Sequence, residues 1–236
     1  MNKVNEHKSS FKKLDPNSKN NDQNLFYLTF ALLVICITLL IYFVYLQLFI
    51  SSQLLLTSFL NTYSTILFSL FFSLLAFFYL LYKTKNLESV IKGLGLSRDM
   101  LTLKNIAIGI SLFIIILGVE LGISLFSEIS HTPLPTNVQQ TLAGLPIYFY
   151  FFTFLIAPIN EEIFFRGFLV NKIGIVPSAI IFAVLHFGYL SISEFVAAFI
   201  FGLIAGYIFK KTRSLYTTIA AHMLLNMLTI VVLFLI

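Results

Sequence analysis

Two adjacent glutamates and an arginine interrupt an apolar stretch in the second half of the chain, at Glu161, Glu162 and Arg166. A carboxylate in apolar surroundings holds protons more tightly than in water and can serve as a general base. Because an α-helix turns about 100° per residue, Glu162 and Arg166 share one face, and we expect an ion pair that supports the site or clamps substrate. Glu161 points about 140° away from Arg166, so it needs another partner. The spacing predicts different roles for the two glutamates.

Two later apolar segments carry imidazole and amide groups. His186 follows Phe182 by four residues, and Asn226 follows His222 by four, so each pair shares a helix face. Ionisable groups inside a membrane cost about 2.5–3.5 kcal/mol each on insertion scales, which makes them functional candidates. If consecutive helices cross the membrane in alternating directions, the helical rise brings Glu161, His186 and His222 to similar depths.

Together these groups could hydrolyse an amide bond without a covalent nucleophile. Glu161 would activate water as the general base, and His186 would help to hold that water. His222 and Asn226 would donate hydrogen bonds to the oxyanion of the tetrahedral intermediate. The predicted catalytic residues are Glu161, Glu162, Arg166, His186, His222 and Asn226.

The elements that must position these groups are membrane helices. The 236 residues are 58% hydrophobic and 11% charged, with a mean hydropathy of +0.94, which excludes an ordinary water-soluble domain. A single cysteine, Cys36, excludes an internal disulfide and a cysteine-based zinc site. The net charge of +5 comes without a basic stripe or a nucleic-acid-binding motif, so we expect no nucleic-acid partner.

An α-helix needs about 20 apolar residues to cross the hydrocarbon core. We therefore predict an all-α, polytopic membrane protein with about seven transmembrane helices, at 25–50, 63–82, 106–127, 145–165 (helical to about 173), 175–190, 194–209 and 215–236. Only SIS joins the fifth and sixth helices, which predicts a tight antiparallel hairpin. Ala198, Gly202 and Gly206 form a series of small residues that predicts close helix packing.

We divide the chain into a disordered cytoplasmic tail (1–24), N-terminal transmembrane helices with an interfacial segment (25–144), and a catalytic core (145–236). If the N-terminus is cytoplasmic, all fifteen Lys and Arg residues lie on or close to the cytoplasmic side, which predicts an N-in, C-out topology. The polar cavity is then expected to open toward the cytoplasm. Within the interfacial segment, residues 83–105 are expected to form a short amphipathic helix in part. Glu120 matches none of the motifs and stays outside the catalytic set.

The three motifs resemble those of the CPBP membrane proteases, the family of CAAX proteases and bacteriocin-processing enzymes that includes the Abi proteins and is related to the type II CAAX prenyl endopeptidase. The matches are EEIFFRG at 161–167 for the family's EExxxR, Phe182 and His186 for FxxxH, and His222 and Asn226 for HxxxN. The resemblance covers about residues 145–236. It implies an α-helical intramembrane endopeptidase whose first motif glutamate, here Glu161, activates water.

We expect such an enzyme to cut a membrane-associated peptide or protein in a bacterial plasma membrane, in bacteriocin or pheromone maturation or in self-immunity. Its expected partners are this substrate and the lipid bilayer. The alternatives are a non-catalytic scaffold or regulatory protein and a proton-coupled transporter. No cofactor is expected. The alternative is zinc held by Glu161, His186 and His222, but the chain lacks an HExxH motif, and Arg166 competes for Glu162.

Overall fold

A computed structural model of the chain describes residues 54–129, 145–186 and 191–235, with side chains from residue 66 onward. Every regular element in these ranges is a helix, which confirms the all-α fold. The helices long and apolar enough to cross a membrane are Ile66–Thr84, Leu103–Ile129, Ile147–Ile173, Ile192–Thr212 and Leu215–Leu235. A shorter apolar helix spans Ile175–His186. The chain is therefore a multi-pass membrane protein.

These helices correspond to six of the seven predicted segments. The first predicted helix, at 25–50, and the tail at 1–24 lie outside the described residues. The fifth predicted segment forms a helix of only twelve residues within the described range, which is short for a full crossing. The count of seven crossings, the N-in, C-out orientation and the cytoplasmic opening of a cavity stay predictions.

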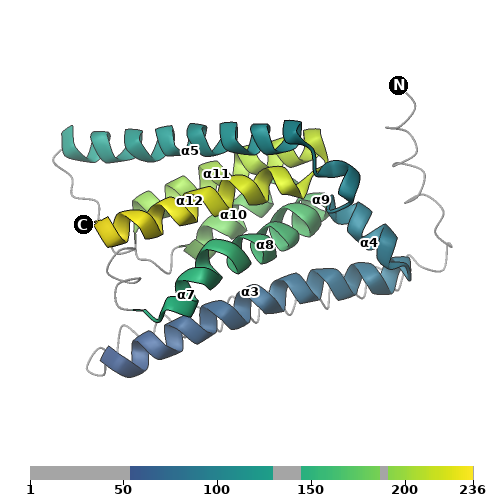
Figure 1. The fold of residues 1–236 in the computed structure, drawn as a ribbon, viewed down its shortest axis with the longest axis horizontal. Coiled ribbons are helices and arrows are strands. Elements are labelled where there is room, and N and C mark those ends of the chain that lie inside the picture. The colour runs from purple at the N-terminus through teal and green to yellow at the C-terminus, as the bar shows by residue number, and fades with distance from the viewer. Residues whose placement is uncertain (1–53, 130–144, 187–190, 236) are drawn as a thin grey trace. The chain divides into compact units, whose positions relative to one another are not determined.

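A short segment joins α3 (Leu54–Thr84) to α5 (Leu103–Ile129) (Figure 1). It contains the helix α4 (Leu87–Leu94) and the 3-10 turn η1 (Arg98–Met100). Asn86 caps α4 by accepting a hydrogen bond from the Ser89 amide, and Gly95 ends it with a φ of 77°. Val90 and Leu94 are buried, so α4 is amphipathic, as predicted for the segment 83–105.

The predicted helical hairpin is formed by α10 (Ile175–His186) and α11 (Ile192–Thr212), which pack along each other. A Cβ atom added to Gly202 would lie 2.9 Å from the Cβ of Ala179, and one added to Gly206 would lie 2.9 Å from Ile175 Cγ2. Residue numbers therefore increase along α11 where they decrease along α10, which confirms the antiparallel arrangement. The two glycines permit the close approach that the small-residue series predicts.

A row of aromatic rings connects the helices around the predicted site. Ring centroids are 4.8 Å apart between Phe72 and Phe164, 5.0 Å between Phe164 and Phe165, and 4.9 Å between Phe165 and Phe182. The row continues from Phe182 to Phe201 at 5.9 Å. Aromatic pairs at these separations stabilise packing beyond the area that they bury. The row fixes α10 and α11 against the helix that carries the glutamates, while α5 packs on the last helix, α12 (Leu215–Leu235).

Candidate active site

The two glutamates lie on a continuous helical run that was predicted as one α-helix but contains two wider turns. Its pieces are α7 (Ile147–Phe151), η2 (Phe152–Ile156), α8 (Ala157–Glu162), η3 (Ile163–Leu169) and α9 (Val170–Ile173). Both η2 and η3 are π-helical, and they flank the six residues of α8. Such turns are rare and occur frequently at functional sites. They change which side chains face the neighbouring helices on either side of the glutamates.

Pro158 gives a physical reason for the first wide turn. It has no N–H, so it cannot donate the usual hydrogen bond to the carbonyl four residues earlier. The preceding amide, that of Ala157, reaches back five residues to the Phe152 carbonyl, which is the π-helical pattern. A periodicity argument assumes a uniform helix, so it could not locate this turn, although Pro158 in an otherwise helical run was its signal.

Glu162 and Arg166 form the ion pair that the spacing predicts. Arg166 Nη1 donates to Glu162 Oε1 at 2.6 Å, and the exposed fractions of the two side chains are 1% and 0%. The guanidinium lies over two neighbouring aromatic rings, with Cζ 4.3 Å from the Phe182 centroid and 4.8 Å from that of Phe201. Cation–π attraction therefore adds to the ion pair in a site closed to water.

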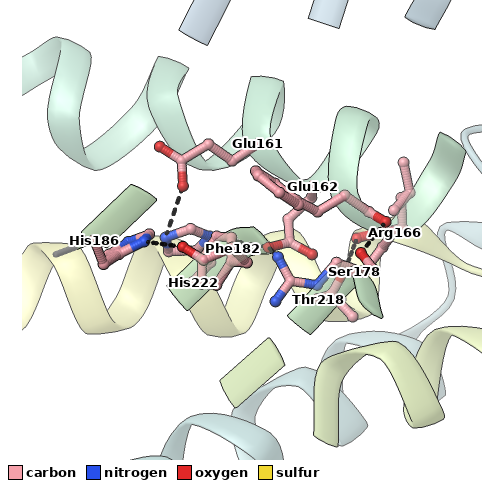
Figure 2. A network of polar contacts seen from close by, with 10 residues as sticks. Glu161, Glu162, Arg166, Ser178, Phe182, His186, Thr218 and His222 are labelled. Carbon is pink, nitrogen blue, oxygen red and sulfur yellow. Dashed lines mark hydrogen bonds and ion pairs between the residues drawn. The ribbon is translucent and has the colours of Figure 1, made fainter. Parts of the chain in front are cut away.

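His222 approaches the same carboxylate from α12 (Figure 2). Its Nδ1 lies 3.0 Å from Glu162 Oε1. Because Arg166 holds Glu162 as a carboxylate that can only accept, the imidazole must donate from Nδ1, and in its neutral form Nε2 is then the unprotonated nitrogen. Thr218, one turn before His222, is buried and donates to the Leu215 carbonyl of its own helix at 3.2 Å. The second glutamate thus holds the imidazole in one orientation.

Glu161 lies on the other side of His222. Its Oε2 atom is 3.8 Å from His222 Nε2, and its side chain is 24% exposed, whereas that of Glu162 is fully buried. Figure 2 shows the Glu161 carboxylate directed toward the two imidazoles. The structure therefore places His222 between the two glutamates, with one nitrogen toward each. The predicted inequivalence of Glu161 and Glu162 is present in this geometry.

His186 extends from α10 toward the same group. Its Nδ1 lies 2.8 Å from the Phe182 carbonyl, and because a carbonyl can only accept, Nδ1 is the donor. The neutral ring then presents Nε2 as an acceptor. Phe182 thus has two roles, since its ring covers Arg166 and its carbonyl orients His186. This explains the four-residue spacing of the pair physically. The expected role of His186 in holding the attacking water stays a prediction.

Asn226 bonds to the helix that carries the glutamates, and its expected role as an oxyanion donor stays a prediction. Its Nδ2 atom donates to the Thr153 carbonyl at 2.8 Å, within the first π-helical turn. A wide turn leaves carbonyl groups without their usual helical partners, so this bond stabilises η2 and ties it to α12. Ser178 does the same for the second wide turn by donating to the Phe165 carbonyl at 3.0 Å. Asn226 is therefore engaged with the helix of the glutamates.

Two further residues of the network were missed from the sequence. Ser178 contacts the glutamate helix through its hydroxyl group, and the Phe201 ring lies against both Arg166 and His222, 5.1 Å from the imidazole centroid. Nothing in the sequence distinguishes Phe201 or Ser178 from other apolar-helix residues. Glu120 lies on α5, half-buried.

The alternative zinc ligands do not form a metal site in the described part of the chain. There, no group of three or more His, Cys, Asp or Glu side chains lies in an arrangement that could hold a metal ion. The expectation that the reaction needs no metal stays a prediction.

Comparison with known protein families gives a match. Residues 143–228 match the family model described as type II CAAX prenyl endopeptidase Rce1-like. The matched range contains all six predicted catalytic residues. No curated protein and no solved structure matches the chain. Over this segment, which carries the Glu161–His222–Glu162 network, the chain is similar to the Rce1-like type II CAAX prenyl endopeptidases, and this similarity supports a relationship to the CAAX proteases.

Proposed function

We propose that the chain is an intramembrane endopeptidase that hydrolyses a peptide bond with water activated by Glu161. The observation that carries the proposal is the position of His222 between a partly exposed Glu161 and a buried Glu162 that is paired with Arg166. A base held by an oriented imidazole, which is itself held by a third group, is the general arrangement of activated hydrolytic sites. The family match supports an intramembrane CAAX-type protease at the level of the family.

In the proposed reaction Glu161 takes a proton from water while the water oxygen forms a bond to the substrate carbonyl carbon. His222, protonated on both nitrogens, donates from Nε2 to the oxyanion, and Glu162 balances its charge through Nδ1. The peptide C–N bond then breaks, and the proton held by Glu161 passes to the leaving amine. His186 accepts a hydrogen bond from the attacking water through Nε2. Asn226 supports this geometry through its hydrogen bond to the Thr153 carbonyl, which ties α12 to the helix of the glutamates.

The proposed substrate is a membrane-associated peptide or protein, because the glutamates lie within helices that are apolar enough to cross a bilayer. In a bacterial plasma membrane this activity would serve bacteriocin or pheromone maturation, or immunity against an incoming peptide. The prenyl specificity in the family description belongs to the family model, and prenylated peptides are therefore one arm of the test.

Cleavage of peptide substrates by the purified full chain tests the proposal. Glu161→Gln is expected to lower the rate by about 10²–10⁴-fold, the usual contribution of a general base. His222→Ala is expected to have an effect of similar size. The matched control is Glu120→Gln, which neutralises another glutamate of an apolar helix and should keep near-normal activity. Activity that survives both Glu161→Gln and His222→Ala would contradict the catalytic assignment.

A chelator arm addresses the role of metal. The proposed reaction uses no metal ion, so activity is expected to persist after prolonged incubation with chelator. Loss of activity that zinc restores would overturn this mechanism. A full chain that cleaves no prenylated, leader-type or transmembrane peptide, while remaining folded, would favour the scaffold or the transporter.

A further inference from the structure

A second group of polar residues, outside the glutamate network, gathers where α9 and α11 end. We call Asn171, Lys210 and Arg213 the Asn171 cluster. The Asn171 Nδ2 atom donates to the Gly167 carbonyl at 2.8 Å, which fixes the direction of the amide. Its Oδ1 atom accepts from Lys210 Nζ at 3.0 Å and from Arg213 Nη1 at 3.3 Å. One neutral oxygen therefore holds two cations close together.

The charges of this cluster are not balanced by the described part of the protein. In residues 54–129, 145–186 and 191–235, no carboxylate forms an ion pair with Lys210 or Arg213. Two like charges at such short range repel each other, and the amide oxygen offers only a dipole in return. A bound anion removes this repulsion and accepts the remaining N–H groups. Phosphate groups fit well, because arginine and lysine bind them with strong, charge-assisted hydrogen bonds.

The backbone holds the cluster in place before any ligand arrives. Arg213 ends α11 with a φ of 57°, in the left-handed region that non-glycine residues seldom adopt, and its amide bonds to the Phe209 carbonyl. The turn packs on Gly95, where an added Cβ would lie 2.5 Å from the Arg213 carbonyl oxygen. Leu215 N donates to the Gly95 carbonyl at 3.0 Å. This turn is a common way for a helix to end, and its packing on Gly95 holds Arg213 in one place.

The surroundings of the cluster favour an amphiphilic ligand. Lys210 and Asn171 lie near the ends of two helices that can cross a membrane, which is where lipid headgroups are found. Large side chains are exposed beside them, with exposed fractions of 54% for Val176 on α10 and 56% for Tyr207 on α11. The first residue of α10 packs one helical turn before Lys210, at Gly206. A cationic pair next to exposed apolar helix surface matches a phosphate head with acyl chains.

We propose that the Asn171 cluster binds the phosphate group of an anionic phospholipid, with the acyl chains against α10 and α11. The site is separate from the glutamate network and does not depend on the proposed protease activity. The proposal places the lipid phosphate at Lys210 and Arg213, which share the amide oxygen of Asn171. This is more specific than the general attraction of basic residues to acidic membranes.

Native mass spectrometry of the full chain, released from uncharged detergent micelles that contain phosphatidylglycerol or phosphatidylcholine, tests the proposal. We expect phosphatidylglycerol to bind about tenfold more tightly than phosphatidylcholine, and either Lys210→Gln or Arg213→Gln to remove that preference. The matched control is Lys211→Gln, because Lys211 has the same charge but lies 5.5 Å from the Tyr207 ring centroid. Its loss should weaken binding no more than about fivefold, as for a general surface charge.

Two substitutions of Asn171 give a second test, in which both Lys210 and Arg213 are kept. Asn171→Asp and Asn171→Ala both lose the bond to Gly167, so they share any loss of stability. The aspartate adds an internal counter-ion, and we expect it to abolish the lipid preference, whereas the alanine variant keeps both charges without their shared acceptor and should lose only part of it. Equal losses in Lys211→Gln and Arg213→Gln, or equal behaviour of the two Asn171 variants, would overturn the proposal. Full occupancy by inorganic phosphate without a lipid preference would assign the site to a free anion instead.

Discussion

Two glutamate–cation pairs with the same four-residue spacing lie in opposite surroundings. Glu88 and Lys92 pair on the surface helix α4 at 2.7 Å, with side chains 73% and 52% exposed. Glu162 and Arg166 pair at 2.6 Å with almost no exposure. The local geometry is thus nearly identical, but water screens the first pair and is excluded from the second. The comparison shows that helical spacing predicts a contact, whereas its energetic and functional weight comes from the neighbours.

Removing the glutamate should give the largest difference in stability between the two pairs. Glu162→Gln leaves the Arg166 guanidinium buried without its counter-ion, which costs about 3–5 kcal/mol of folding free energy. Glu88→Gln should leave stability essentially unchanged, because both of its charges stay hydrated. The measurement is the thermal unfolding midpoint of each variant in detergent micelles.

A double variant keeps this first prediction testable if Glu162→Gln does not fold. Glu162→Leu combined with Arg166→Met removes both charges and fills the volume with apolar groups, so it should recover much of the lost stability. Activity should not return, because His222 then loses the acceptor that orients Nδ1. A double variant as unstable as the single one would show that the pair is not the cause.

Replacing the cation while keeping its charge should have a smaller effect. Arg166→Lys removes the flat guanidinium from the rings of Phe182 and Phe201, and we expect a loss of about 1–2 kcal/mol. Lys92→Arg on the exposed pair should change nothing measurable. Unfolding midpoints and peptidase rates of both variants check this. If Arg166→Lys behaved as wild type in both assays, stacking would not be part of the buried pair's stability.

A neutral hydrogen bond in each region extends the comparison. Asn226 donates to the Thr153 carbonyl at 2.8 Å near the buried pair, and Asn105 donates to the Met100 carbonyl at 2.7 Å near the exposed one. Asn226→Ala should cost about 1–2 kcal/mol and slow peptide cleavage, because the π-helical turn loses its tie to α12. Asn105→Ala should lower stability less and leave kcat unchanged. Equal effects on kcat would show that Asn226 does not act through this turn.

The smallest expected effect is the response of the exposed pair to pH and salt. The hydrogen bond from Lys92 lowers the pKa of the Glu88 carboxyl below its ordinary value of 4.5. The stabilisation is therefore present above about pH 4.5 and is lost as pH falls through the lowered pKa. Salt at about 1 M should also remove it, because the screening length falls to about 3 Å.

The measurement compares unfolding midpoints of the wild-type chain and Lys92→Gln across this pH range and at low and high salt. The difference between the two proteins should shrink at low pH and at high salt. The buried pair provides the reference, since no mobile ions reach Glu162 and Arg166. A salt effect on Glu162→Gln as large as that on Lys92→Gln would contradict the distinction between the regions.

The helical segments and one half of the site could be predicted from the sequence. Apolar runs located the helices of the described residues, because the length of a crossing helix depends only on rise per residue and bilayer thickness. The pairing of Glu162 with Arg166 followed from local helix geometry. The antiparallel packing of α10 on α11 followed from a connection too short for any other arrangement.

The remaining contacts needed the tertiary structure. The sequence by itself determined that Glu161 and Glu162 differ, because their angular positions on one helix are a local property. Only the packed helices decided that His222 lies between them, since this depends on the rotation of α12 about its own axis. The same is true of the bond from Asn226 to the turn at Thr153, because no regular periodicity describes a π-helical turn. Spacing within one helix fixes neighbours along that helix, whereas contacts between helices are decided by how all their side chains pack together.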